Sequence, residues 1–318
     1  MDQLSLFKDQ RALINRGLMA LKELQPAAAA DYLEQHRLAY PQGESVAQDL
    51  QLAGCLAEVL QDLPESGPAL PTRFVQAWAR IREFALSLSY PNQSVLDKIK
   101  TALFEQAIQA LENGGLENEP YLTPELPAGF VYLQAGRYDR AIAGLQVCLP
   151  LNRNNALIYG YLGDAYAGRG DTRVARQCYQ EAWLLDPAEV DWDNFRDDEL
   201  KGLTRELMED NHWDLTTARE WLPSYARIEG LLSPKMITLT TGLKELLAEY
   251  GVWRKTLAKN DGQQVRARLF HHGLILSDNE PALTFVKKVD LIEVRRAMKQ
   301  AHSDLFARYL KVLARERG

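Results

Sequence analysis

The chain has little cysteine, with three such residues among 318. Cys55, Cys148 and Cys178 are an odd number, and no two of them form a CxxC pair. This excludes a disulfide-stapled fold and favours reduced thiols, as in cytosolic proteins. No apolar run approaches the ~18 residues that a membrane span needs. The start of the chain lacks the basic residues and apolar stretch of an export signal, so we expect a cytoplasmic protein without a membrane partner.

The usual sequence motifs of enzymes are also missing. There is no GxxxxGKS or GxxxxGKT phosphate loop, no GxSxG elbow, no HExxH zinc pair and no GxGxxG after a strand. The one histidine cluster, His271-His272, places its side chains about 100° apart on a helix, which disfavours a shared metal ion. We therefore expect no catalytic, cofactor or metal site. The alternative is an enzyme site built from scattered carboxylates such as Glu206 and Glu209.

What the chain does contain is a globular composition, with 46% hydrophobic and 25% charged residues. Its charge is unevenly distributed, because residues 251–318 hold 14 Lys and Arg against 7 Asp and Glu while the whole chain has a net charge of −6. An acidic body with a basic C-terminal end could attract a charged partner. Solvent-exposed helix faces of different composition would give the same pattern.

Apolar residues recur at a spacing of three to four along most of the chain, which predicts helices. Such segments include 72–89, 94–113, 263–276 and a last helix over about 290–316. Clusters of proline and glycine separate them. No stretch alternates with the period of two that is typical of strands. The sequence therefore predicts an all-α fold.

The segment 156–189 carries small and aromatic residues at the places that define a 34-residue helix–turn–helix unit. It resembles the tetratricopeptide repeat (TPR), with tyrosines where that family prefers Trp and Phe. Gly163 and Ala175 would let two helices approach closely, and Pro187 would end the second helix. The signature residues are Tyr159, Leu162, Gly163, Tyr166, Ala175, Tyr179, Ala182 and Pro187.

The preceding segment, 122–155, matches at the same period, and Gly136 aligns with Gly170 at the turn between helices. A fainter unit spans 10–43, and a degenerate one spans about 199–230. The matching residues are Ala128, Gly129, Tyr132, Ala141, Leu145 and Cys148, then Gly17, Ala20, Ala29, Leu33 and Pro41, and then Ala218, Leu222 and Tyr225.

The resemblance implies an α-solenoid of antiparallel helix pairs that forms a right-handed superhelix. We expect three regions along it. Residues 1–121 would be an N-terminal helical region with one degenerate unit, and 122–230 would hold the two clear units and one degenerate unit. Residues 231–318 would form a basic, helical C-terminal extension.

The resemblance further implies a non-enzymatic scaffold or adaptor that binds a partner peptide or helix in a groove. The first helices of the units would line this groove. The groove could also be filled by the protein's own C-terminal helices. The matching groove positions are Leu126, Phe130, Leu133, Leu157, Gly160 and Asp164.

An acidic segment with two aromatic residues follows the best unit. It could dock a basic segment of a partner, with the rings as anchors. Alternatively, it is a solvated insertion whose rings pack into the core. The residues concerned are Asp191, Trp192, Asp193, Phe195, Asp197 and Asp198.

The first residues of the chain suggest a second function. Gln3, Leu4, Ser5, Leu6 and Phe7 resemble the pentapeptide by which bacterial proteins bind the replication sliding clamp. This implies a DNA-maintenance accessory protein whose basic end touches phosphates. The same apolar residues could instead start the first helix. The basic end comprises Lys287, Lys288, Arg295, Arg296, Lys299, Arg308, Lys311, Arg315 and Arg317.

Overall fold

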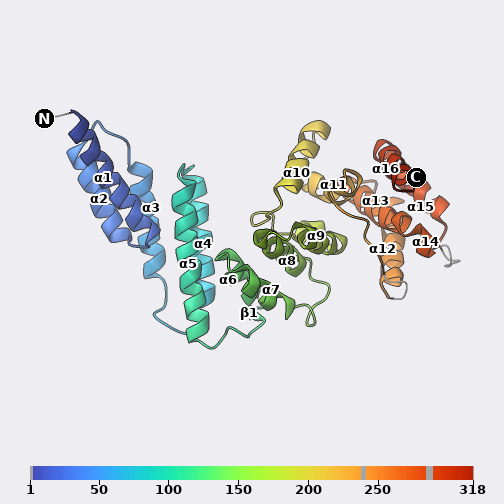
Figure 1. Ribbon diagram of the computed structural model, residues 1–318, viewed down its shortest axis with the longest axis horizontal. Helices are drawn as coiled ribbons and strands as arrows, with labels where there is room; N and C mark the ends of the chain where they lie inside the picture. The colour runs from blue at the N-terminus through green and yellow to red at the C-terminus, as the bar shows by residue number, and fades with distance from the viewer. Residues whose placement is uncertain (1–2, 238–240, 284–288, 318) are drawn as a thin grey trace. The chain divides into compact units, whose positions relative to one another are not determined.

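The computed structural model describes the backbone of residues 3–237, 241–283 and 289–317, and it is almost entirely helical (Figure 1). This confirms the predicted all-α class. The chain divides into two compact units, 1–151 and 152–318, and the three regions expected from the sequence stay a prediction. Within the described ranges, no helix combines the length and the apolar character that crossing a bilayer requires.

The first unit consists of helices that each pack on the next one along the chain, with α5 contacting α1 and α6 as well. A short antiparallel strand pair joins α5 to α6. Fully buried Leu33, Leu56, Ile81 and Phe104 form part of its interior. The elements are α1 Gln3–Lys22, α2 Pro26–Ala39, α3 Ala47–Gln61, α4 Leu70–Ser87, α5 Gln93–Asn113, β1 Tyr121–Thr123, β2 Leu126–Pro127, α6 Ala128–Gln134 and α7 Tyr138–Gln146.

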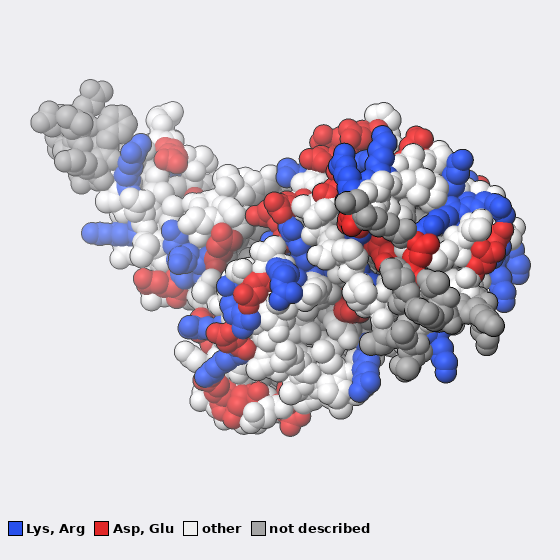
Figure 2. All heavy atoms as spheres, turned by 45° about the vertical axis from the view of Figure 1, so that its right-hand side comes forward, with Lys and Arg blue, Asp and Glu red and all other residues white. Residues whose placement is uncertain are grey.

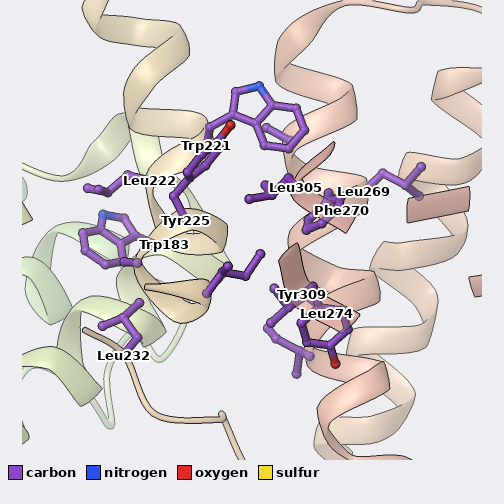
Figure 3. Close-up of a cluster of buried hydrophobic side chains, with 14 of the residues drawn as sticks. Trp183, Trp221, Leu222, Tyr225, Leu232, Leu269, Phe270, Leu274, Leu305 and Tyr309 are labelled. Carbon is purple, nitrogen blue, oxygen red and sulfur yellow. The ribbon is translucent and has the colours of Figure 1, made fainter. Parts of the chain in front are cut away.

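The second unit has one continuous core, in which α11 packs against α10, α13 and α16 (Figure 3). The largest fully buried side chains of this core are Trp183, Trp221, Tyr179, Tyr309, Phe195 and Phe270. The elements are α8 Ala156–Arg169, α9 Thr172–Leu185, the 3-10 turn η1 Pro187–Glu189, α10 Asp198–Asn211, α11 Leu215–Ile228, α12 Thr241–Leu257, α13 Gln263–Asp278, α14 Glu280–Leu283, α15 Leu291–Ala301 and α16 Ser303–Arg317.

The predicted single helix over about 290–316 is wrong, because the chain breaks between α15 and α16 at His302. This residue has an extended backbone, with φ −156° and ψ 99°. Its Nδ1 accepts a hydrogen bond from the backbone N–H of Leu305, and so it caps the following helix. Periodicity alone did not reveal the break, since apolar residues continue at helical spacing on both sides.

Three helix-to-helix turns in the predicted repeat segments share one hydrogen-bond pattern, which also occurs at Ser89 between α4 and α5 and at Gly115 after α5. Each has a left-handed residue, at Leu24, Gly136 and Gly170, with φ of 57°, 76° and 95°. In each, the N–H of this residue donates to the carbonyl three residues earlier, and the next N–H donates to the carbonyl five residues before itself, at 2.8 Å. These two bonds are the Schellman arrangement at a helix C-terminus. The three turns fall at the same position of the segments 10–43, 122–155 and 156–189.

Each of these turns is preceded, seven residues earlier, by a glycine that touches the next helix. A Cβ atom at Gly17, Gly129 or Gly163 would lie 2.6, 2.7 or 2.3 Å from the side chain found 16 residues later. Those side chains are Leu33, Leu145 and Tyr179. A methyl group at any of the three glycines would therefore force the paired helices apart.

Candidate functional site

The groove positions expected in the first unit face its interior. Phe130 and Leu133 of α6 are buried, and Leu126 on β2 is half-buried. The ring of Phe130 lies edge-on to that of Phe104 in α5, with the ring centres 6.2 Å apart. Phe130 and Leu133 therefore pack inside the unit, whereas Leu126 keeps part of its surface exposed.

Two of the groove positions expected in the second unit, Gly160 and Asp164, are covered by the chain that follows η1. Val190 lies over Gly160, where a Cβ atom would meet its side chain at 3.6 Å. Tyr161 of the same helix donates to Asp191 at 3.1 Å. Leu157 is half-buried, and Asp164 is 1% exposed. The chain's own residues from 190 onward occupy this face of α8.

Asp164 is the most unusual carboxyl group on that face. Its Oδ1 accepts hydrogen bonds from the Tyr179 hydroxyl at 2.7 Å and from the backbone N–H of Arg196 at 3.0 Å. Burial raises the pKa of Asp164 to about 8, because desolvation disfavours the charged carboxylate more than these two donors stabilise it. Asp164 thus ties the covering segment to the α8–α9 pair.

The acidic segment turns its aromatic rings inward. Phe195 is buried, and its ring centre lies 4.5 Å from that of Tyr179 and 4.6 Å from that of the half-buried Trp192. Asp197 is also buried, and it pairs with Arg176 at 2.8 Å while capping α10. Asp193 and Asp198 remain exposed. The exposed part of the segment is therefore acidic without an aromatic anchor.

The remaining predicted sites are at the chain ends. The side chains of Gln3, Leu4, Ser5, Leu6 and Phe7 lie outside the described residues, so clamp binding stays a prediction. Lys287, Lys288 and the side chain of Arg317 also lie outside them.

Among the described cations of the basic end, three form ion pairs. Arg295 pairs with Glu280, Arg296 with Glu293, and Arg308 with Glu229. Lys299, Lys311 and Arg315 are exposed. On the face shown in Figure 2, Lys and Arg side chains lie among Asp and Glu side chains rather than in one basic patch.

A surface cavity of about 170 Å³ opens in the second unit, where sequence reasoning placed no site. Residues of α9, η1, α11, α12 and α13 form its walls, and they are mostly apolar, with several charged or polar groups between them. The lining residues are Trp183, Leu184, Leu185, Pro187, Glu220, Pro223, Glu249, Val252, Trp253, Arg268, His271 and His272.

Arg268 is the central charged group of this cavity. Its Nε and Nη2 both donate to the carboxylate of Glu220 at 2.8 Å, and Nη2 also donates to Asp186 at 2.6 Å. Its guanidinium lies 5.2 Å from the ring centre of Trp253. Glu220 is held further by Gln264, whose amide donates to it at 3.0 Å. These contacts hold the guanidinium among Glu220 of α11, Trp253 of α12 and Asp186, which precedes η1.

Two lining side chains have buried nitrogen atoms for which the described part of the chain supplies no hydrogen-bond partner. They are Trp183 and His271, the latter with both ring nitrogens unsatisfied. Burial lowers the pKa of His271 to about 3, which keeps the imidazole neutral. The neighbouring His272 donates from Nδ1 to the carbonyl of Arg268 at 2.7 Å, and its Nε2 lies 3.1 Å from Glu249.

The adjacent histidines were one signal of this site in the sequence. Glu220 and Arg268 are 48 residues apart, and their pairing depends on how α11 and α13 pack. Pro223 inside α11 is a second signal, because it cannot donate a helical hydrogen bond. Among the residues with described positions, no three His, Cys, Asp or Glu side chains are arranged to hold a metal ion.

The cysteines lie apart from this cavity. Cys148 is buried and its Sγ lies 3.2 Å from the carbonyl oxygen of Pro120, to which it donates. Burial raises the pKa of Cys178 to about 12, and it raises the pKa values of Cys55 and Cys148 as well. Reactive thiols need a lowered pKa, so these three are poor nucleophiles.

Comparisons with protein-family models, with curated proteins and with solved structures found no match for this chain. The cavity around Arg268 is the candidate site that the chain's own geometry supports best.

Proposed function

We propose that this protein is a TPR-like solenoid scaffold that binds a segment of a partner protein. The observation that carries the proposal is the recurrence of one helix-pair geometry in 10–43, 122–155 and 156–189. In each, a glycine touches a bulky side chain 16 residues later, and a left-handed turn residue lies seven residues after the glycine. Stacked helix pairs of this kind bury their apolar faces on their neighbours and leave an extended surface for partners.

The partner segment binds at the cavity around Arg268 rather than at the groove positions on α6 and α8. Phe130 and Leu133 are buried inside the first unit, and Gly160 and Asp164 are covered by residues 190–196. The cavity, in contrast, reaches the surface, since Val252 on its edge is 57% exposed.

The size of the cavity favours protein recognition over catalysis. Small-molecule and cofactor sites typically occupy roughly 300–1,000 Å³, whereas a cavity of about 150 Å³ takes a benzene-sized group. A space of about 170 Å³ therefore accommodates one side chain of a partner. Its two most buried charged groups, Arg268 and Glu220, are also paired with each other rather than left to act on a substrate.

Site-specific photo-crosslinking tests this proposal. A photoreactive residue in place of Val252 is expected to give one discrete, stoichiometric adduct in native lysate. The same residue in place of Ile292, which is exposed on α15 and outside the cavity, is the matched control. A discrete adduct at 252 that is missing at 292 supports binding at the cavity. An absence of any discrete adduct at 252 contradicts it.

A further inference from the structure

The carboxylates around the cavity outnumber its cations, and this imbalance indicates what binds there. Among the described lining residues, the carboxylates of Glu220 and Glu249 stand against one guanidinium, that of Arg268. Asp186, which pairs with Arg268, adds a further carboxylate between the lining residues Leu185 and Pro187. Lys235, whose charge also acts on His271, is already paired with Glu181. The neighbourhood of the cavity is therefore negative, and a cation entering it would be attracted.

Two of these carboxylates keep an oxygen atom available. Asp186 uses Oδ1 for Arg268 and for the backbone N–H of Ala188, and Glu249 uses Oε2 for His272. Within the described residues, the second oxygen of each has no hydrogen-bond partner. Both residues are partly exposed, at 35% and 46% of their side chains. In contrast, Glu220 is 2% exposed and has both oxygens occupied.

The walls of the cavity fit an aliphatic chain that carries a charge better than they fit a compact ion. Pro187, Pro223, Val252 and the ring of Trp253 supply apolar surface beside the carboxylates. A basic side chain buries its methylene groups along such surface and keeps its charged end at the polar edge. The face of an indole ring also attracts cations.

We propose that the cavity receives a lysine or arginine side chain of the partner protein, an inference that rests on the proposed function. Its charge is bound by Glu249 and Asp186, and its stem lies against Trp253 and the two prolines. The partner is therefore a protein with an accessible basic segment. An acidic segment or a purely apolar one fits the cavity less well.

The test uses the full-length protein and blocked pentapeptides that differ only in a central lysine, norleucine or glutamate between glycines. Binding is followed by NMR through the indole N–H signals of Trp183 and Trp253. We expect the lysine peptide to shift these signals at the lowest concentration and to bind about fivefold more tightly than the norleucine peptide, the gain of about one ion pair. Added salt is expected to weaken the binding of the lysine peptide and to leave the binding of the norleucine peptide unchanged.

The variant Glu249→Gln is expected to reduce affinity for the lysine peptide about fivefold and to leave the norleucine peptide unchanged. Glu245→Gln, on an exposed position of the same helix, is the matched control and is expected to bind as the unmodified protein does. Equal binding of the lysine and glutamate peptides, or equal effects of the two variants, would overturn the inference.

The two proposals fail in distinguishable ways. If the crosslink at position 252 forms but the lysine peptide shifts no indole signal, the scaffold binds its partner through another kind of side chain. If the crosslink is absent while the lysine peptide binds, the cavity binds a basic group, but the protein does not act as a scaffold for a partner protein. Loss of both results overturns both proposals.

Discussion

The ring of Tyr179 lies so close to Gly163 that a Cβ atom at the glycine would be 2.3 Å from Cε1 of the ring. The Tyr179 hydroxyl in turn donates to Asp164. Gly163 and Tyr179 therefore fix the separation of α8 and α9, and the hydrogen bond to Asp164 fixes the rotation of the ring. This contact is where the packing of the helix pair is most sensitive to a small change.

The variant Gly163→Ala is expected to destabilise the protein by about 1–3 kcal/mol or more, because a buried and hydrogen-bonded ring has little room to move. Gly202→Ala is the control, since no atom lies within 4 Å of a Cβ atom at that helical position. The control is expected to be stabilising by about 0.5–1 kcal/mol. Urea denaturation of both variants measures the difference, and equal midpoints would contradict the close packing.

Asp164 is expected to make the stability fall as the pH rises. Its pKa is about 8 in the folded protein and 3.8 ordinarily, so the folded state binds the proton more tightly between these values. The resulting stabilisation is complete below about pH 4 and is lost as the pH rises to 8. Asp164→Asn keeps an oxygen acceptor for Tyr179 and Arg196 but does not titrate.

Urea midpoints at pH 5 and pH 8 check this prediction. The unmodified protein is expected to lose stability between the two values relative to Asp164→Asn. Parallel behaviour of the two proteins would show that the carboxyl group is ionised in the fold.

His271 is expected to have the opposite effect, so that the stability of the protein falls as the pH falls. Its pKa is about 3 in the folded protein against an ordinary 6.5, so the unfolded chain binds the proton more tightly in this interval. The stabilisation that comes from keeping this imidazole neutral is complete above pH 6.5 and is lost as the pH falls toward 3. His271→Leu is expected to lose less stability than the unmodified protein between pH 7 and pH 4.5.

The exposed His212 supplies the control, because His212→Asn keeps a residue type that tolerates its left-handed backbone at φ 53°. That variant is expected to follow the unmodified protein in thermal denaturation at both pH values. An unchanged acid sensitivity of His271→Leu would mean that the imidazole is not held neutral.

Arg227 and Asp278 form a buried ion pair between α11 and α13, with an Nε–Oδ2 distance of 2.8 Å and exposures of 4% and 1%. Tyr309 of α16 donates to the same carboxylate at 2.8 Å. Asp278→Ala is expected to destabilise the protein by about 3–5 kcal/mol, because it leaves a guanidinium buried without this partner. Arg227→Met combined with Asp278→Leu is expected to cost less, since no uncompensated charge remains.

The exposed pair of Glu34 and Arg37 is the comparison for this prediction. Glu34→Ala is expected to change the free energy of unfolding by less than about 1 kcal/mol, because solvent screens an exposed pair. Chemical denaturation of the three variants gives the comparison. A loss below about 1 kcal/mol for Asp278→Ala would show that the pair is dispensable.

The sequence by itself determined the all-α class, because helical periodicity depends on local spacing. Gly163 and Tyr179 are 16 residues apart, and Gly170 supplies the left-handed turn between them, so one short segment contains the whole pattern. The tertiary structure alone decided that Val190 and Phe195 cover the face of α8, and that Arg268 of α13 meets Glu220 of α11 and Asp186. Such contacts join residues up to 82 positions apart, and their geometry follows from how whole helices pack rather than from any local spacing.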